Sequence, residues 1–119
     1  MQLEELRVYS LSMEIAEDIW LIVREWDYFT KDTIGKQLVR AVDSIAANLS
    51  EGYGRYHYRE KINFSYYSRG SLYETKTWLQ KAYNRKLLTD DSYDLFTDLI
   101  NDIGVKLNNY IKSTAKSTQ

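Results

Sequence analysis

The sequence predicts an all-α protein, an antiparallel up-down-up-down four-helix bundle, and three observations favour that fold class. The chain has 119 residues with no proline and five glycines, so few residues interrupt a helix. Apolar residues recur at alternating spacings of three and four, as on the buried side of a bundle helix. No segment shows the strict alternation of apolar and polar residues that is typical of a strand.

The composition is that of one soluble domain, with 44% hydrophobic and 28% charged residues. We expect a bundle domain over residues 1–112 and a frayed tail over residues 113–119, whose apolar content is too low to pack. The absence of cysteine excludes disulfides and thiolate metal sites. No apolar run approaches the roughly 20 residues that cross a bilayer, and the first residues do not resemble a signal peptide. We therefore expect a cytoplasmic protein with no membrane partner.

The first predicted helix spans residues 3–26 and carries two apolar stripes, which together are too wide for a single neighbour. Either the helix lies deep among the other helices, or it also faces a second subunit. One stripe comprises Leu6, Tyr9, Met13, Ala16, Trp20 and Val23, and the other comprises Ile15, Ile19, Ile22 and Trp26.

The second predicted helix begins with Asp32 or Thr33 as its N-cap and ends at Gly52 and Gly54. These two glycines can adopt a positive φ at little steric cost, which favours them as helix terminators. The expected core side of this helix comprises Ile34, Leu38, Ala41 or Val42, Ile45 and Leu49. Small residues on the same helix would let another backbone come close.

The third predicted helix spans residues 58–85 and contains Gly70 at its middle, where glycine usually marks a close contact between helices. The fourth begins after Thr89, whose hydroxyl is expected to cap its first turn, and continues to Lys112. Asp90 and Asp91 suit the positive end of its dipole.

The net charge of −1 hides a basic middle segment. Residues 36–86 carry 10 basic and 4 acidic side chains, whereas residues 1–35 carry 3 and 8. Arginine and lysine can neutralise phosphates, and tyrosines can stack on unpaired bases, so the segment is a candidate surface for RNA or DNA. One alternative is that acidic and basic helices simply complement each other, within a subunit or between subunits. Another is a solvated helix junction whose tyrosines cover neighbouring apolar surface. The candidate binding residues are Lys36, Arg40, Arg55, Tyr56, His57, Tyr58, Arg59, Lys61 and Arg69.

Catalytic chemistry finds little support. His57 is the only histidine, so a di-iron centre of the ferritin type lacks its ligands and a serine nucleophile lacks an imidazole base elsewhere. Glu51 and Glu74 are expected to accept hydrogen bonds where the second and third helices meet rather than to act as an acid–base pair. Gly52 and Gly54 end a helix, unlike the glycines of a phosphate-binding loop. We expect no catalytic residues, no metal and no cofactor.

Two blocks of sequence resemble the signature of the four-helix bundle proteins linked to 23S ribosomal RNA intervening sequences. The first block spans residues 37–55, and the second comprises Phe64, residues 68–72 and Glu74; together with the opening helix, the resemblance covers roughly residues 3–112. It implies a bacterial source and an antiparallel bundle that assembles as a homopentameric ring. Relatives include the accessory protein of diversity-generating retroelements, which binds nucleic acid and a reverse transcriptase. Ala46, Val39 and Ser65 depart from the usual residues, and Val39 removes a frequent positive charge.

A polar junction between the second and third helices is expected beside the glycines. Asn48 and Glu51 share one helix face, and we expect them to find partners in Ser71 or Arg55. The junction residues are Asn48, Glu51, Gly52, Gly54, Gly70, Ser71 and Glu74. Two hypotheses for function remain open. One is a non-enzymatic oligomeric scaffold that binds nucleic acid or a nucleoprotein partner, and the other is a protein-interaction ring without a nucleic-acid role.

Overall fold

The computed structural model describes residues 2–116, and this part of the chain is helical apart from short connections. Four long helices are present in it, which confirms the all-α prediction. The elements are a 3₁₀ turn (Leu3–Glu5), α1 (Arg7–Val23), α2 (Tyr28–Thr30), a π-helical turn (Lys31–Gly35), α3 (Lys36–Tyr53), α4 (Tyr58–Asn84) and α5 (Asp90–Lys116).

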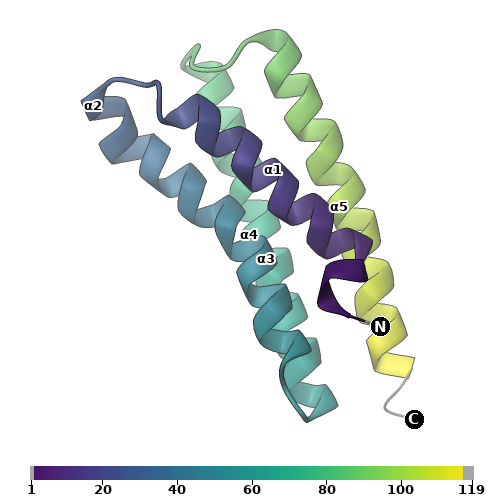
Figure 1. Ribbon diagram of the computed structural model, residues 1–119. Helices are drawn as coiled ribbons and strands as arrows, with labels where there is room; N and C mark the ends of the chain where they lie inside the picture. Colours follow the sequence, from purple (N-terminus) through teal and green to yellow (C-terminus); the bar gives the residue numbers. More distant parts are fainter. Residues whose placement is uncertain (1, 117–119) are drawn as a thin grey trace.

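The four long helices surround one apolar core. α1 contacts α3 and α5, and α4 contacts the same two helices from the other side (Figure 1). The molecule is elongated, with extents of 49 × 23 × 21 Å. The expected core side of the second helix is confirmed, since its apolar positions are buried. The fully buried large apolar side chains are Ile15, Ile19, Leu38, Val42, Ile45, Leu49, Leu79, Ile100, Ile103 and Leu107.

The two apolar stripes of the first helix are buried to different extents. Ile15 and Ile19 are 0% and 1% exposed, so the core receives their stripe. The other stripe is divided, since Ala16 and Val23 are buried, whereas Met13 and Trp20 are 44% and 52% exposed. Helix α1 therefore presents apolar surface outward as well as inward.

The first helix is shorter than the 24 residues over which it was predicted, since α1 covers only Arg7–Val23. Leu6 interrupts it with extended backbone, at φ −71° and ψ 117°. A 3₁₀ turn precedes that residue, held by a hydrogen bond from the backbone N–H of Gln2 to the Glu5 carboxylate at 3.3 Å.

The second helix begins earlier than predicted, and the assignment of Asp32 or Thr33 as N-cap is wrong. Asp27 is the cap, and its carboxylate accepts a hydrogen bond from the backbone N–H of Thr30 at 2.9 Å. The hydroxyl of Thr33 donates instead to the carbonyl of Phe29 at 2.8 Å, within the helix. The helical chain then passes through the π turn and reaches α3 without a break.

The last helix begins as predicted and ends later. The hydroxyl of Thr89 accepts a hydrogen bond from the backbone N–H of Ser92 at 3.1 Å, which confirms the cap. Helix α5 continues to Lys116, four residues beyond the predicted boundary, and the hydroxyl of Thr114 donates to the carbonyl of Tyr110 at 2.9 Å. The remainder of the predicted tail, residues 117–119, lies outside the described residues. Among the helices described, none combines the length and the apolar character needed to cross a membrane.

Candidate nucleic-acid interface

The turn that joins α3 to α4 lies at one end of the molecule, at the bottom of Figure 1. It carries a basic and aromatic hollow. The hollow has a volume of about 450 Å³, and two cationic side chains and three aromatic rings line it. The lining residues are Arg55, Tyr56, His57, Tyr58 and Lys61. The structure therefore brings the centre of the predicted cluster together on one surface.

Gly52 lets the end of α3 lie directly against α4. A Cβ atom at this position would be 2.8 Å from Cβ of Phe64 and 3.2 Å from the carbonyl oxygen of Lys61, so only glycine fits without a shift. This contact confirms the close packing predicted here. The predicted helix end is confirmed, since α3 ends at Tyr53 with Gly54 as its C-cap, but it does not use the positive φ that glycine allows: Gly54 has a φ of −77°, and no glycine in the described residues has a positive φ. The chain leaves α3 through a right-handed turn.

Both cations of the hollow have local partners. The Arg55 guanidinium is 2.5 Å from a carboxylate oxygen of Glu51 and lies over the Phe64 ring, 5.0 Å from its centroid. The ammonium group of Lys61 donates to the carbonyl oxygen of Tyr53 at 3.2 Å and lies 5.6 Å from the centroid of that ring. These contacts hold the charged groups at the rim of the hollow, where a phosphate could reach them.

The rings of the hollow are open to solvent. Tyr56 is 88% exposed, and its ring meets the His57 ring edge to face at a centroid distance of 5.1 Å. Tyr58 is 47% exposed. Arg59 is also exposed and takes part in no ion pair within the described residues. The hollow thus offers exposed rings, and Arg59, which follows Tyr58 in the sequence but does not line the hollow, adds an exposed cation near the turn.

Three of the predicted basic residues do not join this surface, and the expectation that they extend it is wrong. Lys36 and Arg40 line a different hollow, between α1 and α3. Arg40 precedes Arg55 by fifteen residues, about 22 Å along a helix. Arg69 lies on the face toward α5, where it donates to the side-chain oxygen of Asn108 at 3.1 Å. A helix face turns by about 100° per residue, so charges on one helix need not share a surface.

The polar junction between α3 and α4 is confirmed in part. The side-chain amide of Asn48 donates to the hydroxyl of Ser71 at 3.4 Å, and Glu51 pairs with Arg55, as predicted. Glu74 instead forms a hydrogen bond within α4, where its carboxylate accepts the indole N–H of Trp78 at 3.2 Å. The close contact predicted at Gly70 is also wrong, since a Cβ atom there would meet nothing within 4 Å.

Ser68 is the junction residue that the sequence reasoning missed. Its side chain is fully buried, and its hydroxyl donates to the backbone carbonyl of Ile45 on α3 at 2.8 Å. The sequence indicates this role only through a serine at a position that the apolar periodicity places inward. Serines are frequent along α4, so periodicity alone does not distinguish Ser68 from the others.

The hollow offers groups that can bind an anion and a ring. Glu51 pairs with Arg55, and Glu74 accepts the indole N–H of Trp78. Within residues 2–116, no group of three histidine or carboxylate side chains is placed to hold a metal ion. The cations and rings at the tip are suited to bind a phosphate and an unpaired base.

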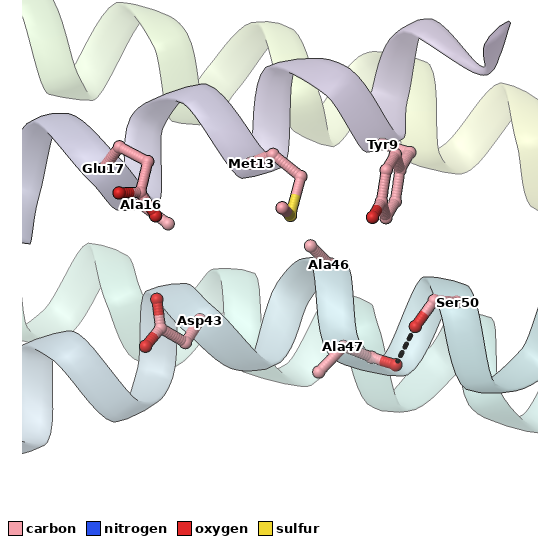
Figure 2. Close-up of a pocket in the computed structure, with 8 residues that line it drawn as sticks. All are labelled: Tyr9, Met13, Ala16, Glu17, Asp43, Ala46, Ala47 and Ser50. Atoms are coloured by element: carbon pink, nitrogen blue, oxygen red, sulfur yellow. Dashed lines mark hydrogen bonds between the residues drawn. The ribbon is translucent and has the colours of Figure 1, made fainter. Parts of the chain in front are cut away.

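A further groove also lies between α1 and α3, separate from the hollow that Lys36 and Arg40 line. The sequence alone did not indicate it. It has a volume of about 320 Å³ and is lined mainly by small and apolar residues. Figure 2 shows Glu17 on α1 and Asp43 on α3 at one end of it, and Tyr9 and Ser50 at the other. Desolvation and the negative charge of Glu17 raise the pKa of Asp43 above its ordinary value.

Comparison with known proteins connects this fold to one family. The family model described as 23S rRNA-intervening sequence protein matches residues 4–109. A crystal structure of a protein of unknown function from the S23 ribosomal protein family of Bacteroides thetaiotaomicron VPI-5482 is similar, with 24% identity and a TM-score of 0.79 over 88% of this chain and 98% of that one. No curated protein matches the sequence. Because the family model covers most of the chain, the protein belongs to the 23S rRNA-intervening sequence protein family.

Proposed function

We propose that the protein is a non-enzymatic oligomeric scaffold that binds RNA or DNA, alone or within a nucleoprotein partner, through the hollow at the α3–α4 turn. The observation that carries the proposal is the placement of Tyr56, 88% exposed, beside the cations Arg55 and Lys61 in one hollow of about 450 Å³. Aromatic rings bind unpaired bases by stacking, and cations beside them bind the phosphates that connect those bases.

Single strands are the preferred form of the ligand. The rings are presented at the tip of a helical hairpin, where an unstacked base can lie flat on the Tyr56 face. A duplex keeps its bases stacked inward and would contact only the cations. The hollow therefore favours a single-stranded segment, loop or end over a duplex of the same length.

Binding at this surface competes with an ion pair within the protein. Arg55 is paired with Glu51, so a phosphate must share or displace that carboxylate. Arg59 has no such competitor in the described structure and is the first phosphate contact. Neutralisation of phosphates releases counterions, which makes the affinity fall as salt rises.

Fluorescence anisotropy with labelled single-stranded RNA, single-stranded DNA and duplex of equal length, at two salt concentrations, tests the proposal. Tyr56→Ala is expected to weaken single-strand binding by about tenfold, corresponding to the roughly 1–3 kcal/mol of one stacked base, and to leave duplex binding nearly unchanged. Arg59→Ala should weaken both and reduce the slope of affinity against salt.

Lys112→Ala is the matched control, because Lys112 is an exposed cation on α5 outside the hollow. No binding by the wild-type protein at low salt would contradict a nucleic-acid role. Unchanged binding after the combined replacement of Arg55 and Arg59 by alanine would move the site elsewhere.

The scaffold part of the proposal is a ring of five copies, each an up-down-up-down bundle, in the cytoplasm of a bacterium. The family resemblance in the sequence is its basis, and the outward apolar surface of α1 supports it, because Met13 and Trp20 are exposed in a single copy. The nucleoprotein partner of such a ring would be a reverse transcriptase or another protein that carries nucleic acid. Sedimentation velocity of the purified protein measures the number of copies directly.

The exposed apolar surface also favours a second candidate function, a protein-interaction ring without a nucleic-acid role. Trp20 and Leu21 on α1 are 52% and 51% exposed, and a ring can use such side chains for partner proteins as well as for its own copies. The two candidates separate in the anisotropy experiment, because only the first predicts binding to nucleic acid at low salt.

A further inference from the structure

The basic hollow between α1 and α3, to which Lys36 and Arg40 belong, has an apolar floor. It has a volume of about 380 Å³, with the indole of Trp20 and the side chains of Val23 and Val39 among its walls. Trp20 is half exposed even though its neighbour across the hollow, Val39, packs against the core. Such a concave apolar surface on a single copy is suited to receive an apolar side chain.

Four cations surround this floor, and their charges are only partly compensated. The rim residues are Arg24, Lys31, Lys36 and Arg40. Lys36 pairs with Asp32 at 3.1 Å and Arg24 with Glu25 at 3.4 Å, both pairs being exposed. Lys31 and Arg40 form no ion pair within the described residues. The occupant of the hollow should therefore combine an apolar group with negative charges.

Helix α5 presents that combination on its outer face. Leu95 is 54% exposed, and Asp91 and Asp98, at four residues before it and three after it, lie beside it on the helix surface. Asp102 and Val105 continue the same stripe, and Val105 is 61% exposed. Only Asp102 has a cation in the described structure, Lys106 at 2.9 Å. We call the residues Asp91, Leu95, Asp98, Asp102 and Val105 the α5 stripe.

We propose that the hollow of one copy binds the α5 stripe of a second copy, with Leu95 against Trp20 and the aspartates of the stripe beside the cations of the rim. The charge pattern on each surface complements the other, and the apolar groups meet at the centre, the usual arrangement of an interface core with a polar rim. This inference rests on the self-assembly part of the proposed function and assigns the surfaces that carry it.

The two surfaces belong to different parts of the chain, which determines the kind of assembly. The hollow lies between α1 and α3, and the stripe is on α5. A contact between two different patches is heterologous, and each copy retains one free patch of each kind for the next copy. Such a contact produces a closed ring when its rotation closes, and does not produce an isolated symmetric dimer.

Sedimentation velocity on the full chain over a range of concentrations, with charge-reversal variants, tests the interface. Arg40→Glu and Asp98→Lys should each raise the dissociation constant at least about tenfold, since each places like charges opposite one another. The double variant restores opposite charges at every contact and should recover most of the assembly. Leu95→Ala and Trp20→Ala should also weaken assembly, while circular dichroism shows unchanged helix content.

Arg59→Glu is the control that separates this inference from nucleic-acid binding, because Arg59 lies at the tip and outside both surfaces. It should weaken nucleic-acid binding and leave assembly unchanged. If the wild type is oligomeric and none of the four interface substitutions changes its assembly, the inference is overturned, while self-assembly itself is retained. A wild type that sediments as a monomer at micromolar concentration would overturn both, and the anisotropy results at the tip would be unaffected.

Discussion

The hydroxyl of Ser68 on α4 donates a hydrogen bond to the backbone carbonyl of Ile45 on α3, at 2.8 Å in a fully buried position. It joins the two helices that form the candidate nucleic-acid interface at a point where a larger side chain would hold them apart. The carbonyl of Ile45 also lies inside α3, where the backbone of its own helix can donate to it.

Ser68→Ala is therefore expected to lower the free energy of unfolding by about 1 kcal/mol, the net value of one hydrogen bond whose acceptor keeps another donor. Ser68→Leu should cost more, about 1–3 kcal/mol beyond that, because the helices must separate. Urea denaturation followed by circular dichroism measures both. Ser44→Ala is the control, since within the described residues that hydroxyl donates to the Arg40 carbonyl of its own helix, at 2.7 Å, and its effect should stay within about 0.5 kcal/mol.

Gly52→Ala and Gly70→Ala form a matched pair with opposite expected signs. At Gly70, a Cβ atom meets nothing within 4 Å, so alanine should stabilise the helix by about 1 kcal/mol through its propensity. At Gly52, the new atom would be 2.8 Å from Cβ of Phe64, which is fixed to the backbone, and destabilisation by about 1–3 kcal/mol is expected. Equal thermal midpoints for the two variants would contradict the difference in packing.

Lys86→Gly should stabilise the turn between α4 and α5. Lys86 has a φ of 63°, the left-handed conformation that glycine adopts without strain. Its N–H donates to the carbonyl of Tyr83, and that of Leu87 to Ala82, the pattern of a Schellman motif with residue 86 at the position that favours glycine. A gain of about 0.5–1 kcal/mol is expected in thermal or urea unfolding. Arg85→Gly should show no gain, because Arg85 has a φ of −89°.

Asp43→Asn should stabilise the protein at neutral pH and flatten its pH dependence above pH 3.8, the ordinary pKa of this group. Desolvation in the α1–α3 groove and the charge of Glu17 raise the pKa of Asp43 above 3.8, so the folded state binds a proton more tightly than the unfolded state. Between 3.8 and the folded pKa, the free energy of unfolding contributed by this group therefore decreases as pH rises.

Urea unfolding of the wild type and the Asp43→Asn variant at pH 4, 5 and 7 measures this difference. Glu14→Gln provides the comparison, because Glu14 is an exposed carboxylate on α1 outside the groove. If the free energy of unfolding changed with pH by the same amount in the wild type and in the Asp43→Asn variant, the role of Asp43 would be contradicted.

The sequence predicted the secondary structure better than the ends of its helices. Apolar periodicity specifies which residues face inward, so Ile45 and Leu49 were correctly placed in the core. The start of the second helix was misplaced because Asp27, Asp32 and Thr33 are all acceptable caps by residue type, and only the structure shows that the Asp27 carboxylate is the one that accepts a backbone N–H, from Thr30 at 2.9 Å.

The candidate site was predicted in its centre and not in its extent. Arg55, Tyr56, His57, Tyr58 and Lys61 are close in sequence, and a short turn between two helices necessarily keeps them together. Lys36, Arg40 and Arg69 are distant in sequence, and their location depends on the rotation of each helix about its axis. Charge counting along the chain contains no information on that rotation.

By itself, the sequence determined the helical class, the core faces, the cap at Thr89 and the basic, aromatic turn, because each depends on residues that are near neighbours along one helix. The tertiary structure decided which glycine is a true contact, which serine joins α3 to α4, and where the remaining cations lie. These properties depend on distances between helices, and residues such as Gly52 and Gly70 are indistinguishable until a second helix is placed beside them.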